Sequence, residues 1–280
     1  MKSDYPILVL CEHLEVSPSG YYDWRNRRTA PGPRALANQT LAQQIKVIHA
    51  QSRQTYGSPR IVNELHKQGR HHGRNRVARL MQAAGLCGRQ RRRYRVQTTD
   101  SNHDQPIAPN RLAQVAKAIA PNQLWAADIT YVETREGWLY LAGILDLYSR
   151  KIVGWAMCDH LRTDLPLAAL RMAISAQRPG AGLIHHSDRG VQYASEDYRT
   201  VIRSAGFQAS MSRKGNCYDN APMESFFHTL KTERVHHRVY ATRDEARRDL
   251  FGYIEGFYNR IRRHSAIGYI SPIEMELKAA

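Results

Sequence analysis

The order of strand and helix patterns in residues 124–212 constrains the fold of this chain most. Three strand runs come first, and two more follow, each after a helix. The strand runs are residues 124–133, 138–150, 151–160, 182–188 and 207–212, and the helices are 165–177 and 195–206. Because short turns join the first three runs, those strands should be antiparallel, whereas strands reached through a helix should be parallel additions. The pattern predicts an α/β fold with a mixed five-stranded sheet and flanking helices.

Two further helices are predicted after the sheet. The first begins near Asn220, which we expect as its N-cap, and Pro222 suits its first turn. The second covers residues 243–263, is basic, and starts with a capping box made by Thr242 and Glu245.

Positive charge is concentrated at the start of the chain. The net charge is +16, of which residues 1–100 contribute +12 and residues 101–280 only +4. An excess this large and this localised indicates a polyanionic partner rather than an ordinary solvated basic surface. We therefore expect the first hundred residues to bind nucleic acid.

A helix-turn-helix is predicted within this basic region, which also holds two short helices over residues 5–28. Helical patterns cover residues 39–53, 58–69 and 73–85, and the last of these is rich in arginine. The residues predicted to contact DNA are Arg74, Arg76 and Arg79 on the last helix, and Arg91, Arg92 and Arg93 in the basic run that follows. The helical pattern alone is weak, because many small bundles share it.

The composition shifts divide the chain into five segments. They are an N-terminal helical segment (1–34), a basic helix-turn-helix domain (35–96), a polar linker with one short helix near 111–119 (97–122), an α/β core with the five predicted strands (123–235) and a C-terminal basic helix and tail (236–280). No run of about 18 apolar residues is present, so a membrane-spanning helix is not expected. The four cysteines form no C-x-x-C pair, and we expect buried free thiols rather than a zinc site or disulfides.

Three acidic residues lie at positions in the predicted fold where they could form one site. Asp128 lies in the first strand, Asp188 at the end of the fourth, and Glu224 on the helix after the fifth. If the first and fourth strands are neighbours, the two aspartates face one spot, and a helix across that end adds Glu224. Converging carboxylates repel one another unless a hard divalent cation relieves the charge. The structural alternative is that each aspartate only caps a turn or a helix. Asp146, which also lies within a strand pattern, shows that an acid in such a place need not be catalytic.

Basic residues on the Glu224 helix extend this hypothesis. Lys231 and His228 share the face of Glu224, and Lys231 is expected to hold a DNA phosphate. His185 and His186 precede Asp188, but at most one of them shares a face with it in a strand, so neither is expected as a metal ligand.

The sequence segments around the three acids resemble those of a known family. Asp188 and Glu224 have 35 residues between them, within "HHSDRGVQYAS" and "SRKGNCYDNAPMESFFHTLKTE", and "WAADITYV" surrounds Asp128. "YNRIRRHSAIGYISPIE" follows near the end of the chain. Together these resemble the catalytic, DDE-type transposase of the bacterial insertion sequences in the family conventionally numbered three. The resemblance covers nearly the whole chain, and the helix-turn-helix words belong to it.

The resemblance implies an RNase-H-like, retroviral-integrase-like core that binds Mg²⁺ or Mn²⁺, two ions in number. Asp128, Asp188 and Glu224 match the metal-binding triad, and Lys231 matches a basic residue that contacts the end of the element. The implied reaction is cleavage at the inverted-repeat ends of double-stranded DNA, followed by attack of the freed 3′-OH on a target phosphodiester. A homo-oligomer, located in the bacterial cytoplasm and associated with the nucleoid, is implied as well.

One departure from the family pattern bears on activity. Family members commonly work as a fusion with an upstream-frame protein that supplies a further helix-turn-helix and a leucine zipper, and no heptad run occurs here. A DNA-binding regulator of transposition that lacks chemistry on its own is therefore the alternative function. A third hypothesis, a nuclease acting on RNA, fits the basic helix-turn-helix less well. The motif Tyr258, Asn259, Arg262, Arg263 and His264 leaves DNA contact and core packing both open.

Overall fold

The structure is a computed structural model that describes residues 5–29, 31–89, 106–112, 115, 117–213 and 220–279. The chain divides into two compact units, Met1–Gly88 and Arg89–Ala280. Arg91, Arg92 and Arg93 lie outside the described residues.

The first unit is entirely helical over its described residues. Its helices are α1 (Ile7–His13), α2 (Pro18–Thr29), α3 (Pro33–Gln51), α4 (Ser58–Lys67) and α5 (Arg74–Ala83). Apolar residues at helical spacing on α3, α4 and α5 pack into one small core that includes Leu41, Ile45, Ile61, Leu65 and Val77. Gly69 ends the turn after α4 with a φ of 75°, a left-handed conformation that suits glycine. The helix-turn-helix prediction therefore matches α4 and α5.

The second unit contains the predicted mixed sheet. Its strands are β1 (Leu124–Thr134), β2 (Gly137–Asp146), β3 (Ile152–Cys158), β4 (Ile184–Ser187) and β5 (Gln208–Met211), in the order β3-β2-β1-β4-β5. The first three strands are antiparallel, and β4 and β5 run parallel to β1. The predicted topology is confirmed.

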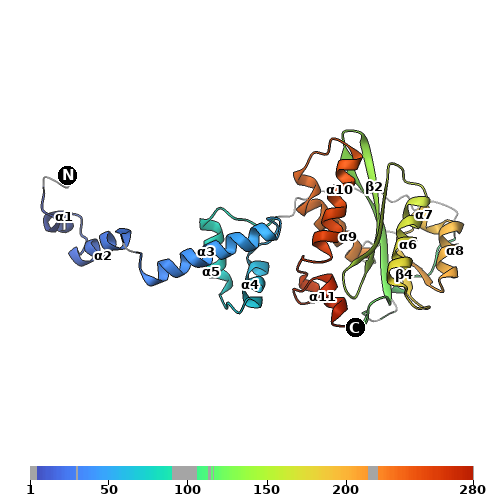
Figure 1. Ribbon diagram of the computed structural model, residues 1–280, viewed down its shortest axis with the longest axis horizontal. Helices are drawn as coiled ribbons and strands as arrows, with labels where there is room; N and C mark the ends of the chain where they lie inside the picture. The colour runs from blue at the N-terminus through green and yellow to red at the C-terminus, as the bar shows by residue number, and fades with distance from the viewer. Residues whose placement is uncertain are drawn as a thin grey trace. The chain divides into compact units, whose positions relative to one another are not determined.

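Helices cover both faces of this sheet (Figure 1). They are α6 (Asp164–Gln177), α7 (Val191–Ala194), α8 (Glu196–Ser204), α9 (Ala221–Glu233), α10 (Arg243–Phe251) and α11 (Pro272–Leu277). Figure 1 shows α6 and α8 on one side and α9 and α10 on the other. Gly154 of β3 lets α6 approach closely, because a Cβ there would lie 2.3 Å from the Ala169 carbonyl oxygen.

Two predictions about local structure need correction, and a third, the short helix near residues 111–119, lies partly outside the described residues. Leu112 has a 3₁₀-helical conformation there, and the N–H groups of Arg111 and Leu112 donate to Ser210 Oγ. The predicted helix 243–263 consists of α10 followed by a π-helical turn, Gly252–Tyr258. Thr242 caps α10 as predicted, but the Glu245 carboxylate accepts from the N–H of Ala241 rather than from that of Thr242.

The cysteines agree with the expectation only in part. Cys11, Cys87 and Cys158 are free thiols, but only Cys11 is buried, and Cys87 is exposed. Cys217 lies outside the described residues. Among the helices that the structure describes, none is long and apolar enough to cross a membrane.

Candidate active site

Asp128 lies in β1 just beyond the point where β4 stops pairing with it. The last residue pair between these strands is Ala126 with His186, so Asp128 lies beyond the paired part of β4. The Ile129 N–H donates to Asp128 Oδ1 at 2.7 Å and orients the carboxylate. The residue is half-buried, at the edge of a cavity.

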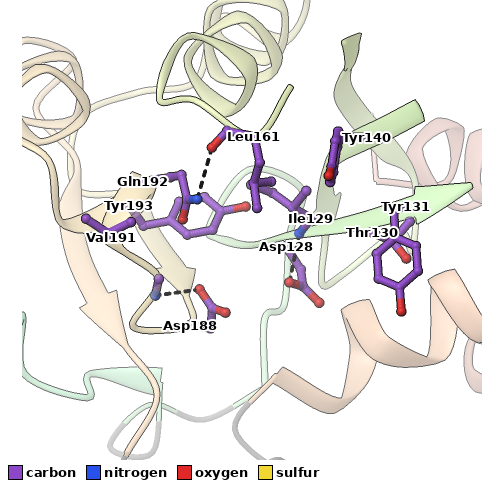
Figure 2. A pocket seen from close by; sticks show the side chains of 11 residues that line it. Asp128, Ile129, Thr130, Tyr131, Tyr140, Leu161, Asp188, Val191, Gln192 and Tyr193 are labelled. Carbon is purple, nitrogen blue, oxygen red and sulfur yellow. Dashed lines mark hydrogen bonds between the residues drawn. The ribbon is translucent and has the colours of Figure 1, made fainter. Parts of the chain in front are cut away.

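Asp188 directly follows β4 and faces the same cavity. Because β1 and β4 are parallel and adjacent, the residues that follow their last pairs lie at one end of the sheet. The Gly190 N–H donates to Asp188 Oδ1 at 2.9 Å. The two aspartates line one cavity of about 120 Å³ (Figure 2). The condition on which the sequence-based hypothesis depended, that the first and fourth strands are neighbours, is met in this sheet.

The electrostatics of Asp128 show that the carboxylates interact. Burial raises the pKa of the Asp128 carboxyl well above its usual range, and the neighbouring Asp188 carboxylate raises it further. Glu224 adds a smaller increase, which the Ile129 N–H and Lys231 oppose. Holding both aspartates ionised in this cavity is therefore costly without a compensating positive charge.

Glu224 lies in the first turn of α9, which packs on the sheet beside Asp128. Gly143 is the cross-strand partner of Asp128, and a Cβ at Gly143 would lie 2.6 Å from Met223 Cε. The absence of a side chain at Gly143 thus admits α9 next to β1. Phe226 and Phe227 are buried, whereas Glu224 is exposed and turned away from that core.

The structure brings two of the three predicted acids into the cavity and leaves the third outside it. Glu224 is near enough to raise the pKa of Asp128 but does not line the cavity. Among the residues described, no three His, Cys, Asp or Glu side chains are grouped closely enough to hold one metal ion.

Lys231 lies two turns along α9 from Glu224 and approaches the same site. Its Nζ lies 4.6 Å from the centre of the Tyr131 ring, a cation–π contact. Burial lowers the pKa of Lys231, and the Asp128 carboxylate opposes that decrease. His228 is half-buried, and its Nε2 lies 3.2 Å from Thr232 Oγ1.

Both histidines before Asp188 are occupied by protein partners. The His185 ring lies 3.1 Å from the Tyr198 hydroxyl, and the two ring nitrogens of His186 lie 2.9 and 3.1 Å from the hydroxyls of Ser210 and Ser212. The two histidines and their three hydroxyl partners are all buried.

Tyr193 and Tyr131 line the cavity and were not predicted as site residues. Tyr193 is buried, and its hydroxyl has no hydrogen-bond partner among the described residues. Figure 2 shows its ring reaching from α7 toward Ile129 of β1. Tyr131 lies three residues beyond Asp128 on β1. A tyrosine alone does not indicate a functional site. The sequence feature that could have identified these two tyrosines is their closeness to Asp128 and Asp188 along the chain.

The arginines predicted to contact DNA differ in their surroundings. Arg74 and Arg79 are exposed on α5. Arg76 is half-buried, and its Nε donates to Asn38 Oδ1 at 3.0 Å, which ties α5 to α3.

The motif near the end of the chain packs on the core. Asn259 donates to and accepts from the backbone of Ile152 in β3, at 3.0 and 2.9 Å. Arg262 forms a buried ion pair with Glu233 at 2.7 Å. Asn259 and Arg262 of this motif therefore bond to residues of the protein core.

Comparison with known proteins identifies matching families. An HTH-like domain matches residues 36–94, and two integrase core domain families match residues 118–217 and 224–279. The chain is 51% identical to the insertion element IS600 uncharacterized 31 kDa protein of Shigella sonnei, over 94% of this chain and 96% of that protein. It is 40% identical to transposase InsF for insertion sequence IS3A of Escherichia coli (strain K12), over 99% of this chain and 96% of that protein. Among solved structures, a chain of the simian T-cell lymphotropic virus intasome aligns with 14% identity and a TM-score of 0.49, over 83% of this chain and 74% of that chain.

Proposed function

The chain belongs to the family of InsF transposases of insertion sequence IS3, and from that premise we propose that Asp128, Asp188 and Glu224 carry its chemistry. It is a DDE-type DNA transposase with an integrase core and a helix-turn-helix-like DNA-binding domain. One observation above all supports the proposed residues. Asp128 and Asp188 line one cavity at the same end of the sheet, and their mutual repulsion makes a cation the natural occupant.

The donor set fits a divalent cation, which we propose to be Mg²⁺ or Mn²⁺, two ions in number. Carboxylate oxygens are the ligands that these hard cations prefer. When bound, the ions would lower the pKa of the attacking water and stabilise charge on the leaving oxygen. Asp128 and Asp188 would hold them from the sheet, and Glu224 would supply the third carboxylate from α9.

Backbone N–H groups orient two of these carboxylates in the protein without DNA. The N–H groups of Ile129 and Gly190 each fix one oxygen of the neighbouring aspartate, which limits rotation of the carboxylates. Lys231 lies near Asp128 and would hold a phosphate beside the site, with His228 on the same helix as a further DNA contact.

The reaction we propose has two steps. Water attacks the phosphodiester at an end of the element and breaks the bond between phosphorus and the 3′ oxygen of the element strand. The products are a free 3′-OH on the element and a 5′-phosphate on the flanking DNA. That hydroxyl then attacks a second phosphodiester, forms a new P–O bond and displaces the target 3′ oxygen. No protein side chain needs to act as a nucleophile.

The remaining elements of the proposal concern assembly and DNA binding. Arg74, Arg76, Arg79, Arg91, Arg92 and Arg93 are proposed to contact the phosphates of double-stranded DNA. The five segments with boundaries at residues 34, 96, 122 and 235 are proposed as the functional division of the chain. We also propose that the protein works as a homo-oligomer, together with an upstream-frame protein, at the bacterial nucleoid.

Substitution of Asp188 tests the proposed chemistry. The substrate is a duplex that carries the inverted repeats read from the DNA on either side of the gene. We expect Asp188→Asn to abolish Mn²⁺-dependent cleavage and joining while DNA affinity persists. Asp197→Asn, the same change at an exposed acid in the first turn of α8, is the matched control and should keep activity.

The outcome also distinguishes the alternative function. Glu224 lies outside the cavity, and this observation favours a regulator that binds DNA without chemistry. If the wild-type chain binds the ends but neither cleaves nor joins them, with or without its upstream-frame partner, the regulator is the better assignment. Cleavage that survives Asp188→Asn would reject the proposed catalytic residues.

A further inference from the structure

Two aromatic residues of the β1–β2 hairpin form a strip that leads away from the cavity. The rings of Tyr131 and Trp138 meet edge to face, with centroids 4.8 Å apart and an interplanar angle of 81°. Tyr131 lines the cavity, whereas Trp138 is 45% exposed. A large aromatic surface therefore faces solvent one side chain away from the carboxylates.

A cation accompanies this strip. Lys231 Nζ lies 4.6 Å from the centre of the Tyr131 ring, and the Asp128 carboxylate influences the pKa of Lys231. Lys231 thus contacts one ring of the aromatic pair and interacts with one proposed metal ligand. Figure 2 shows Tyr131 and Asp128 both projecting from β1 at the edge of the cavity.

The backbone around Trp138 is held in place. Arg243 Nε donates to the Trp138 carbonyl oxygen at 3.1 Å, and the Arg243 N–H donates to Glu136 Oε2 at 2.7 Å. Gly137 forms the turn with a φ of 106°, and a Cβ there would lie 3.0 Å from the Arg243 guanidinium. The hairpin end is therefore tied to the start of α10, and the indole is presented from a fixed strand.

An exposed aromatic ring beside this cavity can stack with a base of bound DNA. Both carboxylates are half-buried in a cavity of about 120 Å³, so a phosphodiester that reaches them enters a recess. A DNA backbone that bends into a recess separates the neighbouring base from its stack, which costs free energy. An exposed aromatic ring recovers part of that cost by stacking with the displaced base, whatever its identity.

We propose that Trp138 is a stacking platform for an unpaired nucleobase at the DNA end, with Lys231 holding the adjoining phosphate. The inference rests on the proposed function, because it assigns the cavity to the scissile phosphodiester. It adds a DNA-contacting site on the catalytic unit and a substrate feature, an unpaired terminal base, that the carboxylates alone do not specify.

Comparison of forked and blunt DNA tests the platform without any cleavage. The probes are a blunt duplex and the same duplex with two unpaired terminal nucleotides, one of them 2-aminopurine, measured with the full chain in EDTA. We expect the wild type to prefer the fork by about tenfold and to quench 2-aminopurine. Trp138→Leu should lose both effects, while Trp138→Phe should keep most of the preference.

The ratio of fork to blunt affinity isolates the platform from the rest of the DNA-binding surface. Contacts made by the basic helical unit contribute to both probes and cancel. Phe251→Ala is the matched control, because Phe251 is 53% exposed but contacts Trp155 of β3 rather than the cavity residues. Circular dichroism and thermal melting confirm that each variant is folded.

A Trp138→Leu variant that is folded and keeps the wild-type fork preference would overturn the proposal. Equal loss in Trp138→Leu and Trp138→Phe would also overturn it, since stacking tolerates exchange of one ring for another. Because the assay needs no chemistry, its failure is distinct from failure of the proposed function, which shows only in the Asp188→Asn cleavage assay.

Discussion

The side-chain amide of Asn220 donates a hydrogen bond to the carbonyl oxygen of Ala127 at 3.2 Å, and both residues are buried. Asn220 occupies the N-cap position of α9, as predicted, but its side chain makes no cap bond to the helix. The bond joins the start of α9 to β1 one residue before Asp128. Glu224 lies one turn further along α9, so this contact links the strand and the helix that carry two of the proposed metal ligands.

Loss of this contact should impair catalysis more than it impairs stability. Asn220→Ala leaves the buried Ala127 carbonyl without its donor, which costs about 1–3 kcal/mol of unfolding free energy. We expect cleavage to fall by at least about tenfold, because misplacement of a ligand by a fraction of an ångström suffices. Thr242→Ala is the matched control: it removes the cap of α10, costs about 1 kcal/mol and should leave cleavage unchanged. Equal cleavage by the two variants would contradict the positioning role of Asn220.

The sheet was predictable because its signals are local. Alternation of apolar residues defined β1 to β3, short connections such as the turn at Gly137 required antiparallel pairing, and helical crossovers required parallel pairing. The strand order was not predictable in this way, so Asp128 and Asp188 could be placed together only on the condition that the first and fourth strands are neighbours.

Contacts between distant residues could not be predicted in this way. Asn220 and Ala127 are 93 residues apart, and nothing in the local pattern distinguishes this amide from a cap. The N–H groups of Arg111 and Leu112 likewise donate to Ser210, about a hundred residues away in sequence. The local pattern of residues carries no information about partners this distant.

The Tyr193 hydroxyl should be dispensable for stability. It is buried without a hydrogen-bond partner among the described residues, so Tyr193→Phe removes no bond and should keep or slightly raise the unfolding free energy. The neighbouring Tyr198 hydroxyl lies 3.1 Å from His185 Nε2, and Tyr198→Phe should cost about 1–2 kcal/mol. Urea unfolding of the two variants in metal-free buffer checks the difference. A Tyr193→Phe variant as unstable as Tyr198→Phe would show that the hydroxyl has a partner in solution.

Acid should destabilise the protein partly through His185. Burial lowers the pKa of His185 from 6.5 to about 3 in the folded state, so only the unfolded chain binds this proton between these values. Its contribution is therefore complete above pH 6.5 and decreases as the pH falls, by about 2 kcal/mol at pH 5. Urea unfolding between pH 5 and pH 7.5 should show a shallower pH dependence for His185→Gln than for the wild type. His236→Gln, an exposed change, should retain the wild-type slope, and identical slopes for all three proteins would reject the prediction.

The ion pair between Arg262 and Glu233 decides whether the C-terminal motif packs or binds DNA. The two side chains are 6% and 7% exposed, and the Tyr253 hydroxyl donates to the same carboxylate at 2.7 Å. Arg262→Met leaves the Glu233 carboxylate buried without its counter-charge and should cost about 3–5 kcal/mol. The double change Arg262→Met with Glu233→Met should recover part of that loss, because it removes the isolated charge together with its partner.

DNA affinity provides the second readout of this pair. Below the melting temperature of the variant, Arg262→Met should bind duplex DNA as the wild type does, because the guanidinium is directed into the protein. Arg260→Met makes the same change at an exposed position on the same segment and should leave the unfolding free energy within about 0.5 kcal/mol of the wild type. A folded Arg262→Met variant with wild-type stability and weakened DNA binding would instead assign this arginine to the DNA interface.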